Sequence, residues 1–240
     1  MDLDCYPAHE CYAIECEALL TFLGSQGEVK HYYSRLRASS RGRDAALQEI
    51  RVAYYLHTRG FPLLRWRPQD APGRDVEFSV RLPDGRPCFV EVKGPTWQSE
   101  LSPAEIAAGR TRQSKYDARV GGAVGPAGTI QRAVKKALPK FTGRAPSLVV
   151  VADYCFVPLG MWGYAPLQMA LTQASAAYGD GLFQGPGYQA VGAVALFWIC
   201  RTSPVEYALA SIANPNAAPS ARLPQELLGV LRTEPSESAP

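Results

Sequence analysis

Residues 73–93, GRDVEFSVRLPDGRPCFVEVK, constrain the fold of this chain more than any other segment. Two runs of strand-forming residues, 75–82 and 86–93, flank a Pro-Asp-Gly sequence, and this pattern predicts a β-hairpin. Pro and Asp suit the centre of a type I turn, and Gly suits the left-handed position after it. The result is a three-residue loop in which Leu82 faces Arg86.

This loop also sets which side chains share a face of the hairpin. If Leu82 faces Arg86, then Asp75 lies opposite Lys93, and Glu77 lies opposite Glu91. Because side chains alternate along a strand, these four groups lie on one face and the apolar residues of the hairpin lie on the other. Three carboxylates and a lysine on one small patch repel and desolvate one another. A hard divalent cation with oxygen ligands is the natural partner of such a patch.

The composition limits the class of protein. A chain of 240 residues fits one domain with additions, and 47% hydrophobic with 20% charged residues excludes wholesale disorder. No apolar run approaches the length of a transmembrane span, so we expect no membrane partner. The acidic start lacks a basic region before an apolar one, which favours a cytoplasmic protein without a secretory signal. The net charge of +3 does not by itself indicate a nucleic-acid partner.

The N-terminal residues Cys5, His9, Cys11 and Cys16 raise the question of a zinc site. Their spacing matches no closed pattern of paired ligands, so ordinary burial is favoured over metal binding, and zinc stays the open alternative.

A helix predicted over residues 44–57 carries an acid on its apolar side. The apolar residues of this segment follow helical spacing, and Glu49 falls in the middle of their stripe. We therefore expect Glu49 to point inward. The alternative is a small rotation of the helix that lets Glu49 reach solvent or pair with Arg51 or Arg43.

After Lys93 the pattern changes, because Gly94 and Pro95 stop the strand and a long segment with only one short helical signal, at residues 102–108, follows. Its basic residues are interleaved with aromatic ones, as suits a segment that orders on a phosphate backbone and stacks on bases. The basic residues are Arg110, Arg112, Lys115 and Arg119. The alternative is a solvated linker.

Next comes a predicted helix at 129–141 with an apolar face and a basic face. Gln131 lies on the border of the apolar stripe, and Lys135 and Lys136 lie toward the polar side. A β-branched run at 148–152 then predicts a strand that is covered on both faces. The remaining expected elements are helices at 8–23, 167–178 and 226–231 and strands at 61–66, 190–200 and 205–212.

The order of these elements resembles the PD-(D/E)XK nuclease superfamily, which has the restriction-endonuclease-like fold. The resemblance rests on Glu49, Asp75, the ExK element Glu91 and Lys93, and Gln131. It implies an α/β fold whose central mixed sheet is flanked by helices, with an αβββαβ core at 42–153. Residues 42–232 would form the nuclease-like domain, 1–41 an N-terminal helical extension and 233–240 a disordered tail. The chain departs from the family name, since Arg74 and not proline precedes Asp75.

What the resemblance implies about chemistry is a Mg²⁺-dependent or Mn²⁺-dependent endonuclease. Asp75 and Glu91 would bind the metal, and Glu49 would bind it directly or through water. Lys93 would orient or deprotonate the attacking water, and Gln131 would position water or the scissile phosphate.

The sequence leaves open the role of Glu77, a rival function and the partners. Glu77 is a spare carboxylate on the same face and a candidate partner of the ligands. The rival function is a non-catalytic module of the same fold that binds nucleic acid or a protein. The nucleic-acid partner is expected to be DNA by family analogy, and a homodimer is one arrangement that would cut two strands.

Overall fold

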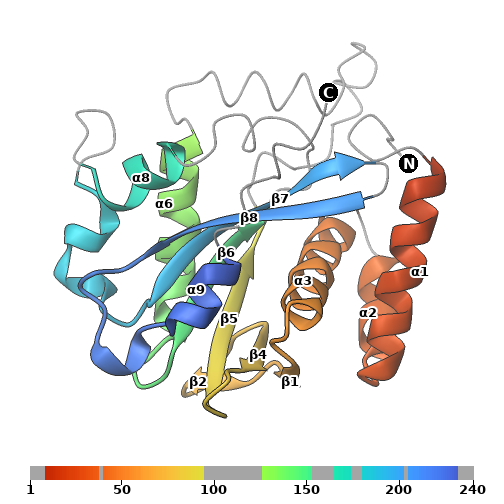
Figure 1. Cartoon of the computed structure of the whole chain (residues 1–240), viewed down its shortest axis with the longest axis horizontal. Coiled ribbons are helices and arrows are strands. Elements are labelled where there is room, and N and C mark those ends of the chain that lie inside the picture. The colour runs from red at the N-terminus through yellow and green to blue at the C-terminus, as the bar shows by residue number, and fades with distance from the viewer. Residues whose placement is uncertain are drawn as a thin grey trace.

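A mixed β-sheet with helices on both faces forms the centre of the protein (Figure 1). The computed structural model describes residues 9–37, 40–94, 126–152, 165–173, 180–202 and 205–231. Within these ranges, six strands form the main sheet in the order β1-β4-β5-β6-β7-β8, and two more form a small second sheet. The expected α/β class with a mixed sheet is confirmed.

The main sheet combines antiparallel and parallel pairs. Strands β4 and β5 pair antiparallel, β5 pairs parallel with β6, and β6 pairs parallel with β7. The two edge strands, β1 and β8, each run antiparallel to their neighbours. The strands are β1 (Leu63–Trp66), β4 (Phe78–Arg81), β5 (Pro87–Lys93), β6 (Ser147–Ala152), β7 (Ala193–Thr202) and β8 (Val205–Ala213).

The hairpin of β4 and β5 has the register that its loop predicts. Arg81 pairs with Pro87 and Phe78 with Val90, and the Leu82 amide donates to the Arg86 carbonyl over 2.9 Å. The third loop residue, Gly85, has φ of 84°, the left-handed conformation that glycine adopts without strain.

Asp75, however, is not part of this hairpin. The β4–β5 ladder ends at the pair of Phe78 and Val90, and Asp75 pairs with Gln69 between β3 (Arg74–Asp75) and β2 (Gln69–Ala71). Pro72 and Gly73, with φ of 68° at the glycine, turn the chain back on itself there. The prediction that Asp75 lies opposite Lys93 is therefore wrong.

Helices cover the sheet in two layers. One layer holds α1 (His9–Ser25), α2 (Val29–Leu36), α3 (Ser40–Thr58) and α9 (Gln225–Val230), and the other holds α6 (Pro126–Ala137) and α8 (Ala165–Leu171). Short 3₁₀ turns complete the chain at η2 (Leu138–Lys140), η3 (Leu182–Gln184), η4 (Pro186–Tyr188) and η5 (Pro219–Ala221).

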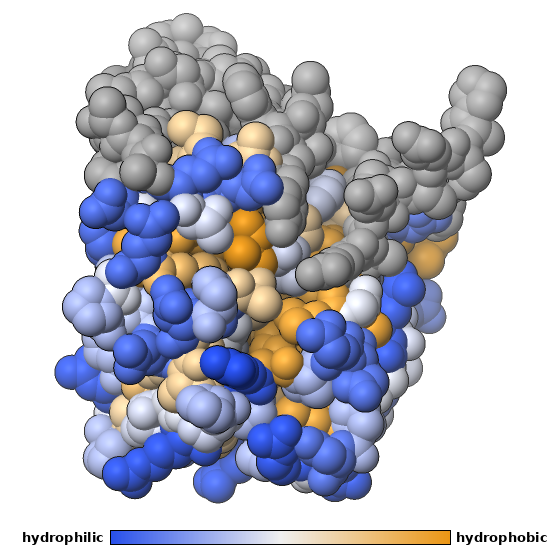
Figure 2. All heavy atoms as spheres, turned by 60° about the vertical axis from the view of Figure 1, so that its left-hand side comes forward, coloured by the Kyte–Doolittle hydropathy of each residue, from blue (hydrophilic) through white to orange (hydrophobic). Residues whose placement is uncertain are grey.

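Each layer of helices shares a hydrophobic cluster with its face of the sheet. Among the described residues, the α3 side contains Ile50 packed with Phe78 and Val90, and the α6 side contains Ile130 packed with Val149. Leu19 of α1 and Tyr32 of α2 belong to the first cluster, so the N-terminal helices share a core with the sheet. Figure 2 shows hydrophobic residues as a band between hydrophilic ones on the face that it presents.

Several element boundaries differ from those expected. Helix α3 starts before residue 44, α2 was not predicted, and the helix expected over 129–141 ends at Ala137 because Pro139 forces a 3₁₀ turn. Helix α8 ends at Leu171, and residues 174–178 of the helix expected at 167–178 lie outside the described residues. So do the helix expected at 102–108 and the tail at 233–240. No helix in the described part combines the length and the apolar character needed to cross a bilayer.

A carboxylate cluster where β4 and β5 part

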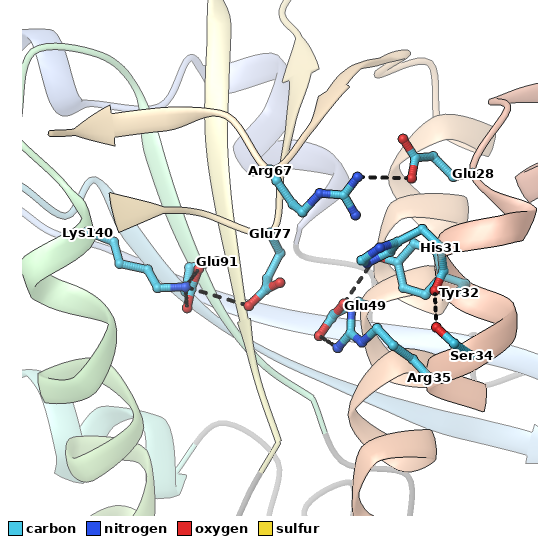
Figure 3. Close-up of polar contacts among 10 residues, drawn as sticks. All are labelled: Glu28, His31, Tyr32, Ser34, Arg35, Glu49, Arg67, Glu77, Glu91 and Lys140. Carbon is cyan, nitrogen blue, oxygen red and sulfur yellow. Dashed lines mark hydrogen bonds and ion pairs between the residues drawn. The ribbon is translucent and has the colours of Figure 1, made fainter. Parts of the chain in front are cut away.

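Two glutamates lie where strands β4 and β5 separate. The last paired residues are Phe78 and Val90, so Glu77 and Glu91 occupy the next facing positions beyond the ladder. Glu91 is fully buried, and Glu77 is largely buried with a side chain that is 20% exposed. In Figure 3 the Glu77 side chain lies between Glu91 and Glu49. The strands therefore bring carboxylates together at this point, as their register predicts.

Two lysine ammonium groups neutralise Glu91. Lys140 Nζ lies 2.7 Å from Glu91 Oε1 and 2.9 Å from Oε2. Lys93, two residues along the same strand, forms an ion pair with Oε1. Glu91 and Lys93, which were predicted to share a face of the hairpin, are therefore in contact. Both lysine side chains are about three-quarters buried, with 24% of Lys93 and 25% of Lys140 exposed.

Glu77 shares the same lysine. Lys140 Nζ lies 3.7 Å from Glu77 Oε1, so one ammonium group serves both carboxylates. Burial raises the pKa of Glu77 to about 7, and the negative charges of Glu49 and Glu91 add to the shift. Lys140 and Lys93 oppose it but do not outweigh it. Burial and the two neighbouring carboxylates therefore outweigh the two lysines in setting the pKa of Glu77.

Glu49 is held from the other side by α2. Both terminal nitrogens of the Arg35 guanidinium donate to its carboxylate, with Nη2 2.6 Å from Oε1, and the Tyr32 hydroxyl donates to Oε2 over 3.1 Å. The hydrogen bond to Glu49 raises the pKa of Arg35. Burial, with the Glu49 charge second, raises the pKa of Tyr32. Bidentate contacts of this kind fix orientation as well as charge.

The inward orientation predicted for Glu49 is confirmed, because the residue is only 5% exposed. Its partner is neither Arg51 nor Arg43, the partners named in the alternative interpretation. Arg51 instead makes a buried bidentate ion pair with Glu15 of α1, at 2.7 Å from each arm. The two arginines thus tie α2 and α1 to helix α3.

The cluster passes around the end of β4 and reaches both faces of the sheet. Glu49 belongs to α3, on the face where Val90 and Val92 pack. Glu91 alternates with these valines and points to the other face, where Lys140 follows α6. Since the charges of Glu49 and Glu91 both act on Glu77, Glu77 links the two halves.

Two of the predicted catalytic residues lie elsewhere. Asp75 is exposed, and its Oδ1 accepts a hydrogen bond of 2.8 Å from the side chain of Gln69. Gln131 is buried and donates to the Ala170 carbonyl of α8 over 3.2 Å. The structure thus brings Glu49, Glu91 and Lys93 into the cluster, adds Glu77, and gives Asp75 and Gln131 partners outside it.

The predicted nucleic-acid contacts are described only in part. Lys135 and Lys136 are exposed on α6, on the polar face expected for them. The basic residues of the long segment after Lys93 lie outside the described residues, namely Arg110, Arg112, Lys115 and Arg119. Cys5 and the side chains of His9 and Cys11 also lie outside, and Cys16 is half-buried.

Three residues of the site were not predicted as such: Tyr32, Arg35 and Lys140. The first two belong to α2, whose sequence signal is short: Tyr32 and Leu36 are spaced as on one helical face, after a break at Gly27. Lys140 falls in the last turn of the helix predicted at 129–141, whereas the structure places it in the 3₁₀ turn η2.

The oxygen ligands of Glu77 and Glu91 suit one hard cation that keeps part of its water shell better than a metal bound by protein ligands alone. Nowhere in the described ranges do three or more His, Cys, Asp or Glu side chains group closely enough to hold a metal. Glu77 and Glu91 nevertheless both lie close to one ammonium group, that of Lys140. Mg²⁺ suits such a pair, since it commonly takes one or two carboxylates and fills its shell with water and substrate phosphate.

Comparisons with known proteins do not add to this geometry. A scan against protein-family models, a search of curated proteins and a search of solved structures each gave no match.

Proposed function

We propose that this protein is a metal-dependent nuclease that hydrolyses phosphodiester bonds, with DNA as its substrate. The observation that carries the proposal is the shared cation position: a single ammonium group lies near both Glu77 and Glu91, and Lys93 contacts the same Glu91. The chain order α3, β1, β4, β5, α6, β6 supports an αβββαβ core of the restriction-endonuclease type.

Glu77 and Glu91 would hold Mg²⁺ or Mn²⁺ in this scheme. When bound, the ion would lower the pKa of a water ligand and offset charge on the phosphorane-like transition state. Glu77 here takes the position opposite Glu91. Asp75, the expected ligand, pairs with Gln69.

The other residues of the cluster have separate tasks. Lys93 is close enough to Glu91 to orient an attacking water there or to donate to a phosphate oxygen. Glu49 is fixed by Arg35 and Tyr32, so it would act as a rigid acceptor for a water molecule near Glu77. Substrate binding would use the exposed Lys135 and Lys136, whose charges suit a phosphate backbone.

Cleavage assays test the proposal. Purified protein is incubated with plasmid, linear duplex DNA, single-stranded DNA and RNA in Mg²⁺, Mn²⁺ or EDTA. We expect cleavage that needs metal, is strongest on DNA, and is lost in Glu91→Gln and Lys93→Ala. Absence of cleavage of every substrate in both metals, by protein that is folded, would contradict the proposal.

A second candidate is a module of the same fold that binds nucleic acid without cutting it. The charge balance of the cluster favours it, because the described part of the site matches Glu49 and Glu91 with the protein's own cations Arg35, Lys93 and Lys140. Binding of DNA without cleavage in either metal would select this function.

A further inference from the structure

We propose that Lys140 is a built-in counter-ion that occupies the cation position between Glu77 and Glu91, so that metal binds tightly only when a substrate phosphate draws Lys140 away. The inference rests on the proposed function and deepens it. It assigns a positioning role to a lysine that lies outside the Glu-x-Lys element.

The position of Lys140 is the first support. Its ammonium group lies 2.7 Å and 2.9 Å from the two oxygens of Glu91 and 3.7 Å from Glu77 Oε1. An ion bound by both carboxylates would need the same space, because cation–oxygen distances for Mg²⁺ are about 2 Å. Lys140 and the ion therefore exclude each other.

The charge of the cluster is the second support. Among the described residues, the carboxylates of Glu49, Glu77 and Glu91 face Arg35, Lys93 and Lys140, which are three acids and three cations. A divalent ion added to this balanced and largely buried group leaves an uncompensated positive charge, which is costly at low local dielectric. A phosphate at the site supplies negative charge and offers Lys140 a new partner.

The flexibility of the lysine makes this exchange feasible. Lys140 is the last residue of η2, and a quarter of its side chain is exposed. Its ammonium sits on a four-carbon stem with several rotatable bonds. By contrast, Arg35 is fixed to Glu49 by two contacts. Lys140 can thus leave its carboxylates at a lower cost than Arg35 can leave Glu49.

Linkage then requires that metal and phosphate strengthen each other's binding. The experiment measures Mn²⁺ affinity by electron paramagnetic resonance, with and without a short DNA duplex whose phosphorothioate linkages resist cleavage. The proteins are wild type, Lys140→Met, Lys140→Arg and the control Lys30→Met, an exposed lysine of α2. Circular dichroism shows that each is folded.

We expect wild type and Lys140→Arg to bind Mn²⁺ weakly alone and about tenfold or more tightly with DNA. Lys140→Met should bind Mn²⁺ about tenfold more tightly than wild type without DNA, and DNA should add less. Lys30→Met should match wild type.

Failure of the inference is distinguishable from failure of the nuclease proposal. Wild type that cleaves DNA but binds Mn²⁺ equally with and without the duplex would overturn the inference alone. A folded Lys140→Met whose Mn²⁺ affinity is unchanged or weaker would do the same. Wild type that binds no Mn²⁺ under either condition and cleaves nothing would overturn both.

Discussion

Glu49 receives both arms of the Arg35 guanidinium, and this pair joins α2 to α3 beside the carboxylate cluster (Figure 3). The Glu49 side chain is 6% exposed and the Arg35 side chain 31%. The arginine therefore gives a buried carboxylate a bidentate partner, and it does so from a helix that lies outside the expected αβββαβ core.

Removal of the arginine should destabilise the protein more than removal of the pair. Arg35→Met leaves the buried Glu49 carboxylate with the Tyr32 hydroxyl as its remaining hydrogen-bond partner among the described residues, and we expect a loss of about 2 kcal/mol after allowance for the exposure of Arg35. The double variant Arg35→Met/Glu49→Gln should recover more than half of that loss. Urea unfolding at neutral pH measures both values.

Arg37→Met is the matched control for this comparison. Arg37 is exposed, and its hydrogen bond goes to the exposed hydroxyl of Tyr33, so we expect a change below about 0.5 kcal/mol. Equal losses for Arg35→Met and Arg37→Met would show that the Glu49 pair contributes little.

The stability of the metal-free protein should depend on the ionisation of Glu77. The pKa of Glu77 rises from 4.5 to about 7 in the fold because of burial and the neighbouring charges of Glu49 and Glu91. The folded state therefore keeps the proton that the unfolded state releases, and the contribution of Glu77 to stability falls as pH rises from about 4.5 to 7. Glu77→Gln removes this dependence.

We expect Glu77→Gln to gain about 2 kcal/mol in free energy of unfolding relative to wild type between pH 5 and pH 8. Denaturant titrations of both proteins in EDTA over this range measure the gain. A difference between the two proteins that stays constant with pH would contradict the raised pKa.

The same substitution separates Glu77 from Asp75 as a ligand. If Glu77 and Glu91 hold the metal, Glu77→Gln should slow DNA cleavage about 100-fold or more, as loss of a charge-stabilising group does in other enzymes. Asp75→Asn should have a smaller effect, since Asp75 is exposed and hydrogen-bonded to Gln69. Initial cleavage rates of the two variants at saturating Mg²⁺ are the measurement. A larger loss of rate in Asp75→Asn than in Glu77→Gln would indicate that Asp75 is the metal ligand.

A second buried pair should affect stability without changing the site directly. Arg51 is fully buried against Glu15, and the Tyr207 hydroxyl also donates to Glu15. Arg51→Met leaves that carboxylate without its arginine, so we expect a loss of about 3 to 5 kcal/mol. Glu17→Gln, at an exposed position of α1, should change stability by less than about 0.5 kcal/mol.

Hydrogen exchange shows which part of the protein is destabilised in Arg51→Met. Amides of α1 should lose protection in Arg51→Met, because the pair fastens α1 to α3. Protection that falls equally throughout the protein would contradict a specific role in docking α1.

The parts of the site that the sequence predicts correctly follow short-range rules. A Pro-Asp-Gly loop fixes the register of β4 and β5 within a few residues, so the facing positions of Glu77 and Glu91 can be derived from it. The helical period places Glu49 inward in the same way. Both inferences use only neighbours along the chain.

The parts that were missed depend on where strands and helices end. Asp75 leaves the β4–β5 ladder because the Pro72-Gly73 turn pairs its strand with β2, and the turn signal was visible in the sequence. Lys140 lies in the 3₁₀ turn after the end of α6, and its contact with Glu91 joins residues 49 positions apart. Arg35 meets Glu49 only after α2 folds back on α3, a tertiary contact that no local pattern encodes.

The most direct test of the account is an anomalous-scattering map from crystals soaked with Mn²⁺ and a short phosphorothioate DNA duplex. We expect one Mn²⁺ peak bound by carboxylate oxygens of Glu77 and Glu91, with the Lys140 ammonium moved to a phosphate oxygen. A map at saturating Mn²⁺ with no peak between these two carboxylates, or with the metal at other residues and Lys140 still on Glu91, would contradict it.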